Sequence, residues 1–267
     1  MSYPIRLALS GSGFLAPIHV GAICALLDND FDIVEVAGTS GGSIAAALLA
    51  AGKSSSQLKQ VSLEPLPADI LSFNLTALFQ QGYCTGEVMH KWLLSTIGDE
   101  TFKDVNIPLH IVATDINAGS AYEFNKVSTP STYLYDACRA SASIPFVYSP
   151  AKVNGIKYCD GGMAVNLPIK YLIEDSIPRL GIRVISGSSS GKTDTLLEYA
   201  GQCLNTLLDA DEDNLAQWAI ESKATVLPVD ASPYSFLNCT LTQEQKLELF
   251  NRGYNAVIPH IKSLQLH

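Results

Sequence analysis

One short stretch of this chain has the residue types and spacing of an activated serine. Residues 34–37 favour a β-strand, Gly38–Gly42 follow with the pattern Gly-x-Ser-x-Gly, and residues 44–51 are small and apolar, as in a packed helix. A strand, a tight turn and a helix place the serine at the apex, where only glycines leave room around it. Ser40 is therefore the candidate nucleophile, and the following helix would offer backbone N–H groups and a partial positive charge.

A serine hydroxyl needs a base that takes its proton, and histidine is the usual one. The sequence places no histidine well for this task. His19 lies near the first glycine-rich turn without an acid partner, His110 lies within an apolar strand, and His90 lies on a helix face; His260 and His267 lie in the terminal helix and at the chain end. A Ser-His-Asp triad is therefore disfavoured.

A carboxylate offers another solution. Asp160 ends the short apolar strand 156–159 and precedes Gly161 and Gly162, which allow close approach of the backbone. Asp160 could accept the Ser40 proton directly if folding brings the two side chains within hydrogen-bond reach. The competing interpretation is that Asp-Gly-Gly is only a turn.

Acyl transfer also requires backbone N–H donors for the developing oxyanion. A glycine-rich turn, Gly11-Ser12-Gly13, lies between the first strand and the first helix. We expect the amides of Gly11, Ser12, Gly13 and Gly41 to form the oxyanion hole. A dinucleotide or phosphate loop is the alternative, but Ala16 stands where the third glycine belongs and no Gly-Lys-Ser/Thr follows.

The elements that position these residues alternate along the chain. Strands at 5–9 and 31–37 each precede a helix, at 17–27 and 41–51, which predicts a three-layer α/β/α fold with a central, mostly parallel sheet. We expect one domain over residues 1–267, with the chemistry-bearing part at about 5–170. Further helices are expected at 87–97, 132–142, 168–175, 193–208 and after Thr242, and further strands at 110–114, 121–124, 156–159, 179–185 and 224–228.

Residues 53–86 have a less regular pattern. They include an apolar run with Ile70, Phe73 and Phe79. This run is either a wall of an acyl-binding site, with Phe73 and Phe79 setting chain-length preference, or part of the core.

Composition excludes several classes of partner. The chain has 267 residues, 47% hydrophobic and 16% charged, with a net charge of −9. This acidity argues against nucleic acid and against electrostatic adsorption to anionic membranes, so any transient contact with a membrane interface would be local and apolar. The six cysteines are scattered without metal-ligand spacing, which favours free thiols in a reducing compartment and predicts no metal or cofactor. With no secretory signal or apolar run long enough to span a membrane, we expect a cytoplasmic location.

Several of these segments together resemble the patatin-like phospholipases. Residues 7–13 with 19–22 are similar to that family's glycine-rich segment and first helix, 38–43 to its nucleophile elbow, and 160–162 to its Asp-Gly-Gly/Ala box. Residues 140–145 and 166–168 are similar to the segments on either side of that box. The resemblance implies a Ser-Asp dyad, with Ser40 as nucleophile and Asp160 as base, that hydrolyses acyl esters of lipids without a metal.

The chain departs from the family pattern in the first motif. The family sequence Gly-Gly-Gly-x-Arg/Lys-Gly is replaced by Gly11-Ser12-Gly13-Phe14-Leu15-Ala16, so the cation is lost. Two alternatives stay open. The altered motif suggests a lipid-binding protein with a degenerate site, and a serine acyltransferase that uses a thioester donor would also place a serine in a similar elbow. An acyltransferase of that kind usually has a carboxylate-binding arginine, for which Arg139 is the candidate.

Overall fold

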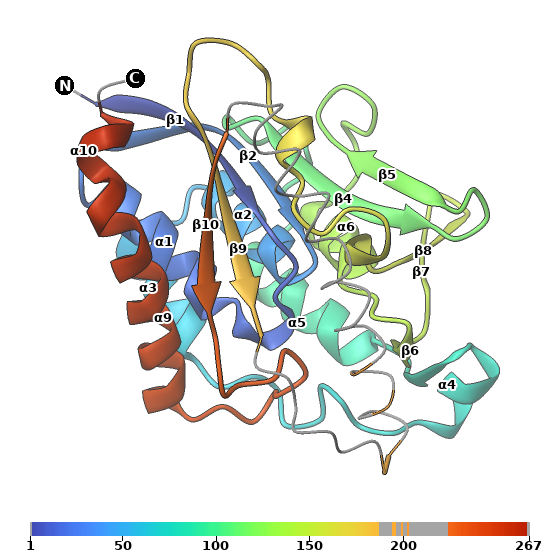
Figure 1. The fold of residues 1–267 in the computed structure, drawn as a ribbon. Helices are drawn as coiled ribbons and strands as arrows, with labels where there is room; N and C mark the ends of the chain where they lie inside the picture. The colour runs from blue at the N-terminus through green and yellow to red at the C-terminus, as the bar shows by residue number, and fades with distance from the viewer. Residues whose placement is uncertain (1, 187–193, 196–198, 200–201, 203–223, 266–267) are drawn as a thin grey trace.

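A central sheet dominates the computed structural model, which describes residues 2–186, 194–195, 199, 202 and 224–265 (Figure 1). Within these residues eight strands pair in the order β10-β9-β1-β2-β4-β8-β7, with β5 on β4. Neighbours among β10, β9, β1, β2 and β4 are parallel, and β5, β7 and β8 pair antiparallel. The strands are β1 (Tyr3–Leu9), β2 (Phe31–Thr39), β4 (Leu109–Asp115), β5 (Ser120–Phe124), β7 (Ala151–Val153), β8 (Ile156–Cys159), β9 (Arg179–Ile185) and β10 (Thr225–Asp230). The predicted α/β fold with a mostly parallel sheet is confirmed.

Helices begin and end where local sequence signals favour it. Pro17 occupies the first turn of α1, and Thr242 and Gln245 form both hydrogen bonds of a capping box at the start of α9. The described helices are α1 (Pro17–Leu27), α2 (Gly41–Ala50), α3 (Ser55–Leu63), α4 (Leu75–Phe79), α5 (Glu87–Ile97), α6 (Leu134–Ser141), α9 (Gln243–Val257) and α10 (Ile261–Leu264). A second, two-stranded sheet pairs β3 (Gly82–Cys84) with β6 (Phe146–Tyr148) in parallel.

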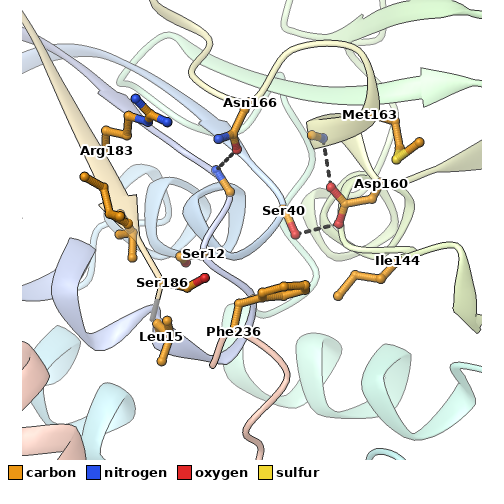
Figure 2. Close-up of a pocket in the computed structure, with 15 residues that line it drawn as sticks. Ser12, Leu15, Ser40, Ile144, Asp160, Met163, Asn166, Arg183, Ser186 and Phe236 are labelled. Atoms are coloured by element: carbon orange, nitrogen blue, oxygen red, sulfur yellow. Dashed lines mark hydrogen bonds between the residues drawn. The ribbon is translucent and has the colours of Figure 1, made fainter. Parts of the chain in front are cut away.

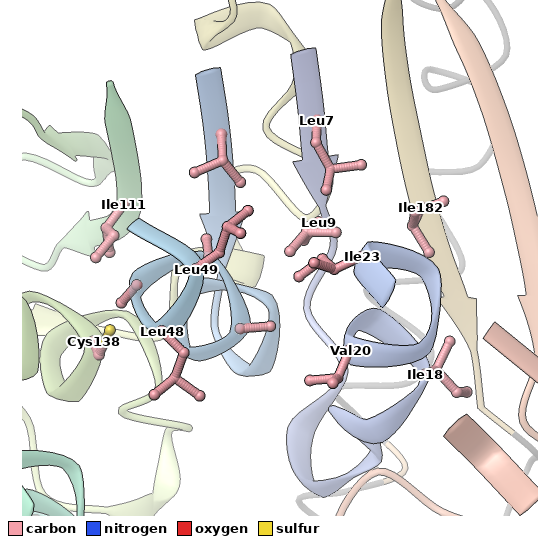
Figure 3. Close-up of a cluster of buried hydrophobic side chains, with 14 of the residues drawn as sticks. Leu7, Leu9, Ile18, Val20, Ile23, Leu48, Leu49, Ile111, Cys138 and Ile182 are labelled. Atoms are coloured by element: carbon pink, nitrogen blue, oxygen red, sulfur yellow. The ribbon is translucent and has the colours of Figure 1, made fainter. Parts of the chain in front are cut away.

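The main core lies between one face of the sheet and helices α1 and α2. Figure 3 shows Leu7 and Leu9 of β1 facing Ile23 of α1. Helix α9 covers the outer side of α1 at very short range: a Cβ at Gly253 would lie 1.9 Å from the Ile18 carbonyl oxygen, so only glycine fits there. Because it is enclosed in this way, α1 is buried on nearly all sides.

The opposite face of the sheet is covered by the chain that follows Asp160. Leu167, Ile169 and Leu172 pack on Ala8 and Ala37. The helix predicted at 168–175 is wrong, because only the 3-10 turn Ile169–Tyr171 forms there. Polar tethers to the sheet hold the rest of this segment out of helical conformation: the Ile173 amide donates to Glu35, and Asp175 pairs with Arg6.

Two other sequence predictions concern the segments 193–208 and 53–86. The helix predicted at 193–208 lies outside the described residues, apart from isolated positions. The loosely patterned segment 53–86 contains α3, α4 and β3, which the sequence analysis did not predict. A local signal for α3 was present, because Ser54 and Gln57 form a capping box at its start.

Candidate active site

Ser40 occupies a strained turn between β2 and α2. Its φ is 50° and its ψ is −123°, a combination that non-glycine residues rarely adopt and that is often held at functional sites. The turn is locked from several sides: the Ser40 amide donates to the Ser141 hydroxyl (2.8 Å), and Thr39 donates to the Val165 carbonyl (3.0 Å). A Cβ at Gly38 would lie 2.6 Å from the Gly42 carbonyl oxygen, so the close turn requires glycine there.

Asp160 lies against this turn although 120 residues separate it from Ser40 in sequence. The Ser40 hydroxyl donates to Asp160 Oδ2 at 2.6 Å, and the Gly162 amide donates to Oδ1 at 2.8 Å (Figure 2). The Asp160 backbone is fixed as well, since its amide donates to the Ser143 carbonyl and its carbonyl accepts from Thr114. Both carboxylate oxygens are therefore oriented, one of them toward the candidate nucleophile.

Burial changes the acidity of this carboxyl group. Only 7% of Asp160 is exposed, and the resulting desolvation raises its pKa to about 6. The hydrogen bonds from the Ser40 hydroxyl and the Gly162 amide favour the charged form and oppose the rise. A carboxylate with a pKa close to neutrality is suited to take and return a proton.

The first glycine-rich turn and the start of α2 meet beside Ser40. A Cβ at Gly41 would lie 2.4 Å from the Ser12 hydroxyl and 2.5 Å from the Gly13 carbonyl oxygen. No described residue accepts a hydrogen bond from the amides of Ser12, Gly13 or Gly41. The Gly11 amide differs, because it donates to the backbone carbonyl (3.1 Å) and side-chain oxygen (3.0 Å) of Asn166. Gly11 thus anchors the loop, and among the described residues no acceptor competes with a ligand for the other three amides.

The described histidines have partners away from Ser40. His19 is fully buried against the Ser10 carbonyl (2.8 Å), and burial lowers its pKa to about 4, so it is neutral. His90 pairs with Asp136 at 2.9 Å. His260 ends the 3-10 turn Ile258–His260, and its backbone carbonyl accepts from the Ser263 hydroxyl at 2.8 Å. None of these hydrogen bonds involves Ser40.

His110 belongs to a buried charge network across the sheet. Its ring nitrogens contact Glu123 at 2.5 Å and Glu35 at 3.0 Å, and Glu35 also pairs with Arg6 at 2.6 Å. Burial alone lowers the pKa of His110, but the two carboxylates outweigh it and raise the pKa to about 9. The charged ring joins β2, β4 and β5, which is a structural role.

Single replacement of the described histidines is expected to leave most of the activity. His19→Gln, His90→Ala, His110→Gln and His260→Ala should keep kcat/KM for ester hydrolysis within about tenfold of wild type, because none contacts Ser40. His110→Gln should instead lower the melting temperature, since it leaves Glu123 without its cation and Glu35 with Arg6 alone. A loss of about 10⁴ in a folded variant would establish a histidine base and overturn the Ser-Asp assignment.

Two cavities meet at Ser40, and their linings differ. One contains Asp160, Asn166 and Arg183, together with the Gly11–Gly13 turn and Phe236. The other is more apolar and runs beside α2; its lining includes Ile44, Leu48, Val61, Leu66, Ile70, Met89, Trp92 and Tyr148. The segment 53–86 therefore contributes to the wall of this cavity. Phe73 and Phe79 are not among the lining residues, and their side chains are 52% and 86% exposed.

Several residues that support the site have roles that sequence patterns did not predict, although Ser141 and Asn166 lie in the segments 140–145 and 166–168 that resemble the family pattern. Ser141 and Asn166 orient the elbow and the first turn through side-chain hydrogen bonds. Arg183 of β9 lines the same cavity as Leu15, the residue that replaces the cation of the first motif, so this cavity still has a cationic residue in its lining. Sequence periodicity gave no signal for the roles of Ser141 and Asn166, since both bond to residues more than 100 positions away in the chain.

Arg139 does not face either cavity as a carboxylate-binding group. Its guanidinium donates to the carbonyls of Thr85, Gly86 and Ser149 and to the Ser143 hydroxyl. It therefore ties α6 to the segments around it. Among the described residues no group of three or more His, Cys, Asp or Glu side chains could hold a metal ion, and no described helix is long and apolar enough to cross a membrane.

Comparison with known proteins gives matches at both the sequence and the structural level. The family model described as "Patatin-like phospholipase" matches residues 7–173. "Uncharacterized protein R571" of Acanthamoeba polyphaga mimivirus is 32% identical over 191 residues, which cover 66% of this chain and 64% of that protein. The chain thus spans less than two thirds of that relative's own length.

Two further similarities extend over almost the whole chain. "Probable lipid hydrolase 463L" of Invertebrate iridescent virus 6 is 25% identical over 268 residues, covering 94% of this chain and 87% of that protein. The crystal structure of VipD from Legionella pneumophila superposes with a TM-score of 0.59 at 14% identity, covering 98% of this chain and 67% of that one. At that identity the structural similarity shows the fold alone.

Proposed function

Because this chain belongs to the patatin-like phospholipase family, we propose that it hydrolyses acyl esters of lipids through Ser40 and Asp160. The observation that carries this proposal is the 2.6 Å hydrogen bond from the Ser40 hydroxyl to the buried Asp160 carboxylate, on a strained turn. The name of the iridescent virus relative, a lipid hydrolase, supports the same class of reaction.

The geometry suggests how each step proceeds. Ser40 Oγ attacks the ester carbonyl carbon while Asp160 takes its proton. The amides of Ser12, Gly13 and Gly41 donate to the oxyanion that forms. The tetrahedral intermediate collapses, the carbon–oxygen bond to the alcohol breaks, and Asp160 returns the proton to the leaving oxygen. A water molecule, deprotonated by Asp160, then attacks the acyl-enzyme carbonyl carbon. The bond to Ser40 Oγ breaks, Asp160 returns the proton to this oxygen, and the fatty acid leaves.

The two cavities suggest where the substrate lies. We assign the acyl chain to the apolar cavity beside α2, because apolar side chains from four helices surround it. The alcohol part then lies in the cavity with Asn166 and Arg183, whose polar groups suit a headgroup. Transfer of an acyl group from a thioester donor is less well supported, because the guanidinium of Arg139 is used by backbone carbonyls and Ser143.

Filling the apolar cavity should change chain-length preference. Ile44 lines this cavity and is only partly buried, so Ile44→Trp can place its ring in the cavity. We expect kcat/KM for a palmitate ester to fall at least about tenfold more than kcat/KM for a butyrate ester of the same alcohol. Ile258→Trp, on a partly exposed residue outside the cavity, is the matched control and should leave the ratio unchanged. An unchanged ratio in Ile44→Trp would remove the acyl chain from this cavity.

A further inference from the structure

An outward-facing apolar surface surrounds the short helix α4. Leu75, Leu78 and Phe79 are spaced i, i+3, i+4 and so share one helix face, yet they are 65%, 49% and 86% exposed. Ala77 is fully buried, and Phe73, just before the helix, is 52% exposed. This arrangement is the reverse of an ordinary surface helix, which packs its apolar face on the core.

Strand β6 adds another exposed aromatic side chain to this region. Its first residue, Phe146, pairs with Gly82 of β3, close to the end of α4. Phe146 is 62% exposed, and its φ of +67° is an outlier for a bulky residue. Figure 1 shows α4 and β6 near each other at the lower right edge of the molecule. We call Phe73, Leu75, Leu78, Phe79 and Phe146 the α4 surface.

The α4 surface belongs to a weakly charged part of an acidic chain. The net charge is −9, yet Asp69 is the only charged residue from 65 to 86, and there is none from 140 to 151. Anionic membranes attract clusters of Lys and Arg, which these two segments lack. Their composition suits an apolar layer beneath a headgroup region without net charge.

The same two segments also connect the α4 surface with the apolar cavity beside Ser40. Ile70, three residues before Phe73, and Tyr148, two residues after Phe146, both line that cavity. The Tyr148 hydroxyl donates to the Ile70 carbonyl at 3.0 Å, which holds the two segments together. Each of the two segments therefore carries residues of the exposed surface and, two or three positions away, a residue of the cavity lining.

We propose that the α4 surface inserts into a zwitterionic phospholipid layer, so that an acyl chain leaves the layer at the cavity beside Ser40. The delivery of the chain to Ser40 rests on the proposed function, whereas the docking itself requires no hydrolysis. Exposed apolar patches of this kind mark interaction sites, and because the same two segments also line the cavity beside Ser40, we assign this patch to a lipid layer and not to a protein partner.

The docking is tested by sedimentation with phosphatidylcholine vesicles, in a Ser40→Ala background that leaves the vesicles intact. The double variant Leu75→Ser, Phe79→Ser should lower the partition coefficient at least about tenfold, since each apolar side chain taken out of the lipid weakens binding by about that factor. Phe146→Ser should lower it in the same direction. Val127→Ser, at a residue that is 92% exposed in the turn after β5, is the matched control and should bind like the parent.

A second measurement separates docking from catalysis. With Ser40 restored, Leu75→Ser, Phe79→Ser should keep its turnover of a soluble butyrate ester but lose at least about tenfold on phosphatidylcholine in vesicles. Absence of soluble-ester turnover in the parent, with normal vesicle binding, would count against the proposed function alone. Unchanged vesicle binding by the Leu75→Ser, Phe79→Ser variant would overturn the docking proposal, as would a preference of the parent for phosphatidylserine vesicles. It would also be overturned if the variant lost self-association in the ultracentrifuge but kept its vesicle binding.

Discussion

Ser40→Ala is expected to lower ester hydrolysis by about 10³ or more while the protein stays folded. The hydroxyl is the only group at the apex of the turn that can attack an ester, and it already donates to Asp160 at 2.6 Å. The backbone hydrogen bond from Ser40 to Ser141 does not involve the hydroxyl and should survive. Turnover of a soluble ester, together with the melting temperature, measures both expectations.

Covalent labelling provides an independent test of the same assignment. A fluorophosphonate probe should modify wild-type protein at Ser40, located by mass spectrometry, and should not modify Ser40→Ala. Ser43→Ala is the matched control: the Ser43 hydroxyl donates to the Ser40 carbonyl at 2.6 Å, and a carbonyl, unlike a carboxylate, cannot take its proton. Modification at Ser43 or Ser12 in wild type would show that Ser40 is not the nucleophile.

Asp160→Asn is expected to cost roughly 10³ or more in kcat, because asparagine keeps the shape but cannot accept the proton. Although it lowers activity, the same substitution is not expected to lower the free energy of unfolding at alkaline pH. The pKa of Asp160 rises from 3.8 to about 6 on folding, so its favourable contribution is complete below pH 3.8 and is lost as the pH rises through 6. The neutral amide avoids this loss, and the variant should be at least as stable as wild type at pH 8.

The same pKa predicts the acid limb of the pH profile. If Asp160 must be ionised to take the proton, kcat/KM should fall about tenfold per pH unit below a pH of about 6. Cys159→Ala, next to Asp160, is the matched control and should keep both the limb and most of the activity. A folded Asp160→Asn enzyme with more than a tenth of wild-type turnover would mean that Asp-Gly-Gly is only a turn.

The sequence by itself determined the features that depend on short range. Alternating strands and helices, the glycines around Ser40 and the capping box at Thr242 are local patterns, and α1, α5, β8 and β9 form over the residues expected. The candidate nucleophile and the candidate carboxylate also came from local patterns, each next to glycines at the end of a strand. Backbone geometry and hydrophobic periodicity act over a few residues, so they can be predicted from the sequence without the tertiary structure.

The tertiary structure alone decided which of these residues meet. The Ser40 hydroxyl donates to the Asp160 carboxylate, the Gly11 amide donates to Asn166, and the Arg139 guanidinium donates to backbone carbonyls. The tertiary structure also replaces the helix expected at 168–175 with tethers from Glu35 and Arg6, whose contacts cross the sheet. Apart from those of Arg139, these hydrogen bonds and ion pairs join residues more than 100 positions apart, and no periodicity along the chain encodes which partners folding brings together.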